Sequence, residues 1–232
     1  MSQATHDKSY EILDEVLKHV PFEGWTSRAL KAAMESTELS VGAEHIYAPD
    51  GALGLLRVWS DRLDQQMVAA IEARGFDNMR IRDKVTEAVW LRLELLRPHQ
   101  EAARRAVSRL SLPTASGQGA TQLWASADAI WTAIGDASED YNYYTKRTIL
   151  SGVIGSTLLA WLSDDTDEKS EARAFLQRRI ENVMQFEKVK GQTLSVMSTL
   201  PKPQDLLPFI QKGPFSPEGR LRKGSSRRRR RY

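Results

Sequence analysis

The chain has 232 residues, of which 41% are hydrophobic and 27% charged, which is enough apolar material for one large or two small domains with a sizeable core. It contains no cysteine, which excludes disulfides, zinc ribbons, iron–sulfur clusters and thiol catalysis and fits a reducing compartment. The net charge is +3, but eight cations lie within residues 220–231, and subtracting them leaves −5 for residues 1–218. The basic pI therefore does not indicate a nucleic-acid-binding globule.

The first fifty residues predict three short helices. An apolar stripe at helical spacing predicts a helix over 9–20 that Pro21 ends. A second helix opens at Trp25 and Thr26, and a third covers residues 39–47 and stops before Pro49. Helices of these lengths and spacings outline a helix-turn-helix unit, which we assign to residues 1–52.

Residues 53–200 predict a larger helical domain. We expect helices over 53–73, 81–96, 102–112, 120–134, 141–162 and 167–190, with a loop at 113–119. No period-two alternation indicates a strand, so the predicted fold class is all-α. Proline and glycine recur over 201–232 without periodicity, which predicts a disordered basic tail.

The N-terminus is polar and carries both signs of charge, so we expect no signal peptide. The longest nearly apolar run, 149–162, is too short to cross roughly 30 Å of hydrocarbon. We therefore expect a soluble cytoplasmic protein that is at most peripheral, on the inner face of the membrane.

A helix-turn-helix outline raises the alternative of a TetR-type, ligand-responsive transcriptional repressor. DNA affinity comes largely from lysine and arginine side chains that neutralise phosphates. The interval 32–56 contains neither residue and carries four acids that repel phosphate, namely Glu35, Glu38, Glu44 and Asp50. We expect no specific binding to DNA.

The chemistry of an enzyme is missing from the pattern. The four histidines are far apart and none forms a Glu-x-x-His pair of the kind that binds di-iron in helical bundles. There is no Walker loop, no Gly-x-Gly-x-x-Gly and no nucleophile elbow. We predict a non-enzyme without a metal or cofactor of its own.

Apolar residues of the second domain offer either a filled core or a pocket for a lipid, and the sequence leaves both open. Small residues on the 141–162 helix, Ser151, Gly152, Gly155 and Ser156, allow close helix packing, as at a homodimer interface, or leave room for a ligand chain. The candidate lipid-binding residues are Met67, Val85, Val89, Leu93, Ile130, Trp131, Leu150, Val153, Ile154 and Leu158.

Three motifs carry a family resemblance over about residues 10–190. They are Asp140-x-Asn142-x-Tyr144-Thr145-Lys146-Arg147 with Leu150, then Gly24-Trp25-Thr26, and finally Phe175-Leu176-x-x-Arg179-Ile180-x-x-Val183-Met184. Together they resemble the accessory proteins of coenzyme Q biosynthesis. The resemblance implies a TetR-like bundle with a degenerate helix-turn-helix. It also implies binding of an isoprenoid quinone precursor or phospholipid, and contact with a di-iron hydroxylase that brings the iron.

The resemblance also implies a partner-binding site at Asp140, Tyr143, Tyr144 and Arg147. In one helix the first three fall at i, i+3 and i+4, hence on one face, with Arg147 one turn further. The alternative is an ordinary capped helix whose tyrosines pack on the core.

The tail leaves its role open. The run Arg227–Arg231 suits anionic lipid head groups at a membrane surface, nonspecific RNA, or solvent. The resembled family ends in an amphipathic membrane-binding helix, and the prolines of 201–208 depart from that pattern. A dimeric helical scaffold is a further alternative for the whole chain.

Overall fold

The computed structural model describes residues 3–37, 42–115, 117–138 and 141–199, without the side chains of 3–6, 141 and 186–199. Every regular element in these ranges is a helix, which confirms the predicted all-α class. The α-helices are α1 (Gln3–Glu23), α2 (Ser27–Ser36), α3 (Glu44–Tyr47), α4 (Gly51–Arg74), α5 (Ile81–Glu94), α6 (Gln100–Leu110), α7 (Gln118–Ala133), α8 (Tyr141–Ser163) and α9 (Ser170–Thr199). Two 3-10 turns, η1 (Arg97–His99) and η2 (Pro113–Ala115), flank α6.

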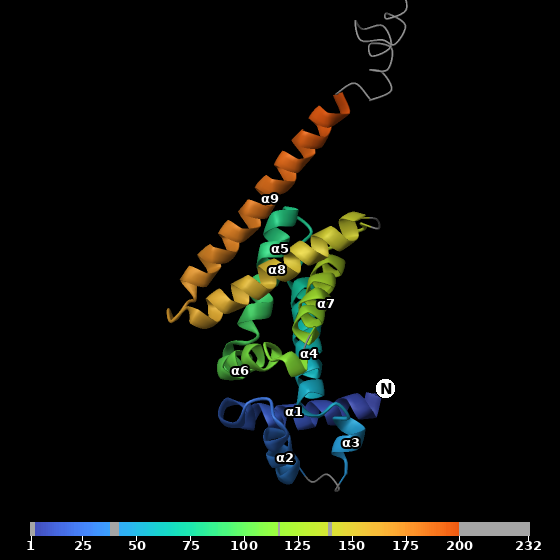
Figure 1. Ribbon diagram of the computed structural model, residues 1–232, viewed down its shortest axis with the longest axis vertical. Helices are drawn as coiled ribbons and strands as arrows, with labels where there is room; N and C mark the ends of the chain where they lie inside the picture. The colour runs from blue at the N-terminus through green and yellow to red at the C-terminus, as the bar shows by residue number, and fades with distance from the viewer. Residues whose placement is uncertain (1–2, 38–41, 116, 139–140, 200–232) are drawn as a thin grey trace, which may run out of the picture. The chain divides into compact units, whose positions relative to one another are not determined.

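The chain divides into a compact unit, Met1–Met184, and a second unit, Gln185–Tyr232, of which the end of α9 is described. In the first unit, α1, α2 and α3 gather at one end, and α4 leads away from them (Figure 1). Helix α4 packs on α5 and α7, α7 packs on α8, and α6 touches α1, α7 and α8. The TetR-like arrangement and the boundaries at 52 and 200 stay predictions.

The connection between α1 and α2 corrects one predicted helix end. Helix α1 runs through Pro21 to Glu23 instead of ending at the proline. Gly24 follows with φ of +69°, a conformation that costs glycine little, and its N–H donates to the Val20 carbonyl. Thr26 then caps α2, accepting from the Ala29 N–H at 3.3 Å. Glycine, not proline, ends this helix.

Other predicted bounds move by a few residues. The predicted loop 113–119 begins as the turn η2, and α7 already starts at Gln118, after Gly117 at φ +80°. Helix α9 starts at Ser170 and extends to Thr199. Helix α3 covers only Glu44–Tyr47, and residues 39–41 of the predicted third helix lie outside the described residues, as does the predicted tail.

Candidate functional site

A cavity of about 310 Å³ lies among α4, α6, α7 and α8. Small-molecule sites run from roughly 300 to 1,000 Å³, so this one is at the small end of that range. Its wall is mainly apolar, and its lining is Leu56, Trp59, Ser60, Leu63, Arg92, Leu96, Ala103, Ala106, Val107, Leu110, Ser111, Gly119, Gln122, Leu123, Gly155, Leu158 and Leu159. The arrangement suits an apolar ligand.

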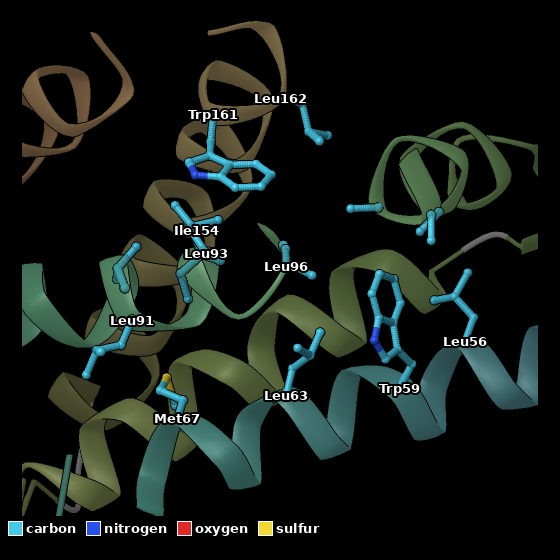
Figure 2. Close-up of a cluster of buried hydrophobic side chains, with 14 of the residues drawn as sticks. Leu56, Trp59, Leu63, Met67, Leu91, Leu93, Leu96, Ile154, Trp161 and Leu162 are labelled. Carbon is cyan, nitrogen blue, oxygen red and sulfur yellow. The ribbon is translucent and has the colours of Figure 1, made fainter. Parts of the chain in front are cut away.

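Helix α4 builds one wall because three large residues recur on a single face. Leu56, Trp59 and Leu63 stand at i, i+3 and i+7 and project from α4 to the same side (Figure 2). All three are buried. Leu96, just beyond α5, approaches the same region from another element.

Helices α7 and α8 approach closely at a glycine. A β-carbon at Gly155 would lie 3.1 Å from Leu123 Cδ1, and both residues line the cavity. A β-carbon at Gly152, one turn earlier, would meet nothing within 4 Å. The two glycines of the predicted small-residue face therefore differ: Gly155 serves close packing and the cavity, whereas Gly152 faces open space.

One charged residue of the wall, Arg92, forms a buried ion pair with Asp64 behind the wall. Arg92 Nε donates to Asp64 Oδ1 at 2.6 Å, and Arg92 Nη2 donates to Ser60 Oγ at 3.0 Å. The Ser126 hydroxyl lies 2.9 Å from Asp64 Oδ2 and 3.0 Å from the Gln122 carbonyl oxygen. Both charged side chains are at most one-tenth exposed, so each depends on the other for its hydrogen bonds.

The structure brings one of the predicted lipid-binding residues to this cavity, namely Leu158. Trp131 packs against the core while partly exposed. The other eight are buried in the packed core, namely Met67, Val85, Val89, Leu93, Ile130, Leu150, Val153 and Ile154. Figure 2 shows Met67, Leu93 and Ile154 in this cluster.

Sequence reasoning missed the wall that α6 contributes. Ala103, Ala106, Val107 and Leu110 line the cavity from that helix. The signal available was the run of alanines on one face, since small side chains facing the larger residues of α4 leave space that Leu or Phe would fill.

The start of α8 carries the predicted partner-binding residues. Tyr144 is 63% exposed, and its ring stacks on that of Trp124 at a centroid distance of 6.2 Å. Tyr143 is half-buried, and its hydroxyl donates to Asp128 Oδ1 at 3.1 Å. Asp140 lies outside the described residues.

Arg147 is not at the rim of this surface, where the sequence placed it, but buried at 3% exposure. Its guanidinium lies 3.4 Å from the centroid of the Tyr143 ring and pairs with Asp128 at 2.6 Å and Asp136 at 3.5 Å. The reason is the packing of α7 on α8, which brings both acids over the arginine. Arg147 is thus a buried residue that packs against the Tyr143 ring and pairs with two acids.

Hydrogen bonds and charges near the start of α8 shift the pKa values of Asp136 and Tyr143. Burial raises the pKa of Asp136, but hydrogen bonds from Lys146 and Ser138 and the charge of Lys146 outweigh it, so the net pKa is lowered. The hydrogen bond to Asp128 raises the pKa of Tyr143. The two shifts favour an ionised Asp136 and a protonated Tyr143 phenol at neutral pH.

Among the described residues, no three or more His, Asp or Glu side chains come together in a way that could hold a metal ion. Likewise, no helix in the described ranges combines the length and the apolar character needed to cross a bilayer.

The fold and the site define an all-α protein with an apolar cavity and an exposed aromatic cluster. Comparison with known proteins adds a similarity to one family. Residues 116–187 match the family model described as COQ9. The chain is 29% identical over 181 residues to the rat "Ubiquinone biosynthesis protein COQ9, mitochondrial", a match covering 75% of this chain and 58% of that protein.

Two further relatives bear the same name. The human protein is 29% identical over 186 residues, covering 75% of this chain and 57% of its own length. The Drosophila melanogaster protein is 28% identical over 194 residues, covering 82% of this chain and 59% of its own. The chain therefore matches less than two thirds of these relatives. The comparisons confirm the resemblance to the coenzyme Q biosynthesis family that the motifs indicate.

Proposed function

We propose that this protein takes part in ubiquinone biosynthesis as a non-catalytic, lipid-binding accessory protein. It would bind a polyprenylated quinone precursor and present it to a di-iron hydroxylase, to which the iron would belong. The observation that carries the proposal is the apolar cavity, because two of the helices that line it, α7 and α8, lie within the region that matches the family. The other two, α4 and α6, pack on α7. The names of the relatives supply the pathway.

Membrane contact and dimerisation belong to the same proposal. A precursor with a long prenyl chain resides in the bilayer, so an accessory protein has to meet the membrane surface at least peripherally. The sequence suggests a cytoplasmic setting for that surface, whereas the relatives are mitochondrial by name. The open face of α8 around Gly152 would be available to a second copy.

The repressor alternative finds no support in the described residues. The exposed cations of α2 face acids of the same chain: Arg28 pairs with Glu23 at 3.0 Å, and Lys31 lies 3.9 Å from Glu35. Paired cations on an acidic surface attract phosphate weakly.

The proposal is tested by extracting the purified chain with organic solvent and identifying the lipid by mass spectrometry. A matched pair of variants tests whether the lipid binds in the cavity. Gly155→Leu places a side chain into the cavity wall, whereas Gly152→Leu makes the same change one turn away in open space. We expect an isoprenoid quinone or its precursor with the wild type and Gly152→Leu, and much less with Gly155→Leu.

Thermal denaturation accompanies the extraction, because overpacking alone costs about 1–3 kcal/mol. A Gly155→Leu protein that melts lower yet keeps its lipid would show that the ligand is bound elsewhere. A wild-type chain that carries no lipid, although it was expressed in cells that make ubiquinone, would favour the scaffold alternative.

A further inference from the structure

The wall of the cavity carries a polar contact at the centre of the α4 face. Ser60 stands four residues after Leu56 and three before Leu63, and all three line the cavity from the same face of the helix. Because a serine side chain is only a β-carbon and a hydroxyl, a serine on this face brings its oxygen to the wall. Arg92, which also lines the cavity, donates from Nη2 to this oxygen at 3.0 Å.

The Ser60 hydroxyl still has a hydrogen to donate. Its oxygen accepts from Arg92, and in the part of the chain that the structure describes the hydroxyl itself donates to no acceptor. Other serines donate to the carbonyl four residues earlier, as Ser108 and Ser111 do at 3.1 and 2.8 Å. Ser60 and Arg92 are each 6% exposed, so neither is sealed off from the cavity that both line. An acceptor oxygen of a ligand fits this position.

The charge of Arg92 is already balanced, which limits the ligands that suit the wall. Arg92 Nε donates to Asp64 Oδ1 at 2.6 Å, and the Ser126 hydroxyl donates to Oδ2 of the same carboxylate at 2.9 Å. Both members of the ion pair are at most one-tenth exposed. A carboxylate or phosphate that entered beside them would be a second negative charge for one buried cation, and its loss of hydration would stay uncompensated. A neutral oxygen needs no such compensation.

We propose that Ser60, held by Arg92, selects the head group of the ligand: its hydroxyl donates to a neutral oxygen, either the carbonyl of a quinone or the hydroxyl of a phenol, and the balanced ion pair disfavours carboxylates and phosphates. This inference rests on the proposed function, because it names the ligand class of the same cavity. Of the two lipids that the sequence leaves open, the quinone precursor fits this wall and a phospholipid head group does not.

The test measures the binding of three similar probes to the full chain by equilibrium dialysis, with mass spectrometry to quantify the bound probe. Each carries a single prenyl group, on a benzoquinone with neutral oxygens, on a benzoate with a carboxylate, or on plain benzene. We expect the wild type to bind the quinone most tightly. Ser60→Ala should weaken quinone binding about fivefold, the value of one neutral hydrogen bond, and leave prenylbenzene binding unchanged. Ser60→Thr keeps the hydroxyl and should keep the preference.

Ser111→Ala is the matched control, because Ser111 also lines the cavity but its hydroxyl already donates to the Val107 carbonyl. It should bind all three probes as the wild type does. Asp64→Asn examines the charge. It leaves Arg92 without its counter-ion, so binding of the prenylbenzoate relative to the quinone should rise about tenfold or more.

The outcomes separate this inference from the proposed function. If the wild type prefers the benzoate, or if Ser60→Ala keeps the full preference for the quinone, the selection by Ser60 is wrong while the cavity remains the ligand site. If the wild type binds none of the three probes, the cavity is not the ligand site, and both proposals lose their support. Should Asp64→Asn fail to fold, since it breaks a buried ion pair, the wild-type comparison of quinone with benzoate decides the charge argument.

Discussion

Adjacent residues at the start of α8 have different roles because neighbours on a helix point about 100° apart. Tyr143 turns inward, where its hydroxyl reaches Asp128 and its ring covers the Arg147 guanidinium. Tyr144 turns outward, with its ring on Trp124. The sequence placed both on one docking face. The structure leaves Tyr144 as the residue that a partner can reach.

We therefore predict that Tyr144→Lys weakens binding to the proposed partner, the hydroxylase, by about 2 kcal/mol or more, over tenfold in affinity, because an exposed aromatic anchor is replaced by a charge. Stability should fall by less than about 1 kcal/mol, since the ring contacts that are lost, with Trp124 and Tyr143, are made by a largely exposed side chain. A pull-down beside thermal denaturation measures both.

Tyr143→Phe is the matched control for this prediction. It removes the hydroxyl that donates to Asp128, and we expect it to cost about 1 kcal/mol of stability while binding is retained. A folded Tyr144→Lys protein that captures the hydroxylase as well as the wild type would remove the docking role from this face.

At the scale of elements, the connection between α8 and α9 depends on one carboxylate. Asp164 Oδ1 accepts from the Thr166 N–H at 2.9 Å and from its hydroxyl at 2.6 Å, and Oδ2 accepts from the Ala172 N–H at 2.8 Å. Lys169, at φ +49°, donates to the Asp164 carbonyl and lies over the Trp161 ring. The carboxylate thus caps the start of α9 and closes the turn.

These hydrogen bonds, the Thr166 hydroxyl first, lower the pKa of Asp164 from 3.8 to about 2. A carboxylate whose pKa is lower in the folded than in the unfolded chain stabilises the fold at every pH above the unfolded-chain pKa. That stabilisation is lost as the pH falls from about 4 towards 2. We predict that the urea midpoint of the wild type drops between pH 5 and pH 3, and that Asp164→Asn is less stable at pH 5 but changes less with pH.

Asp165→Asn is the control for this acid sensitivity, because the neighbouring side chain is exposed. It should follow the wild-type pH profile. Asp136, whose pKa is also lowered, remains in all three proteins and accounts for shared acid sensitivity. An Asp164→Asn profile parallel to that of the wild type would show that the cap does not govern the junction.

Helix existence could be predicted from the sequence because apolar spacing reports a local property. The stripe over 9–20 and the signals at Trp25 and Thr26 correspond to α1 and α2. Helix ends were less predictable. Helix α1 continues past Pro21 to Glu23, and its end depends on the positive φ of Gly24, which sequence spacing does not reveal.

At the scale of the whole molecule, the cavity could not be predicted, because hollow and filled interiors have the same apolar pattern. Ile154 and Leu158 stand one turn apart on α8, yet Ile154 is fully buried in the core and Leu158 lines the cavity. What separates them is the alanine face of α6 and the close approach at Gly155. Both depend on which helices meet, a long-range property.

The N-terminal helices are tied to the rest of the compact unit by Trp25. Its indole is 1% exposed, stacks on Trp59 of α4 at a centroid distance of 5.4 Å, and donates to the Ala102 carbonyl of α6 at 3.0 Å. Trp59 also lines the cavity. One side chain of the Gly24-Trp25-Thr26 motif thus connects the α1–α2 junction to two helices that line the cavity.

This link predicts that residues 1–52 do not unfold separately from the helices around the cavity. Trp25→Ala should cost about 3–5 kcal/mol, as expected for a large buried side chain, and should lower one common transition followed by circular dichroism and by tryptophan fluorescence. Trp25→Phe keeps a ring against Trp59 but leaves the Ala102 carbonyl without the indole donor, so it should cost less. Two separate transitions in the wild type, where Trp25 is intact, would instead make the three N-terminal helices an independent domain and favour the boundary at residue 52.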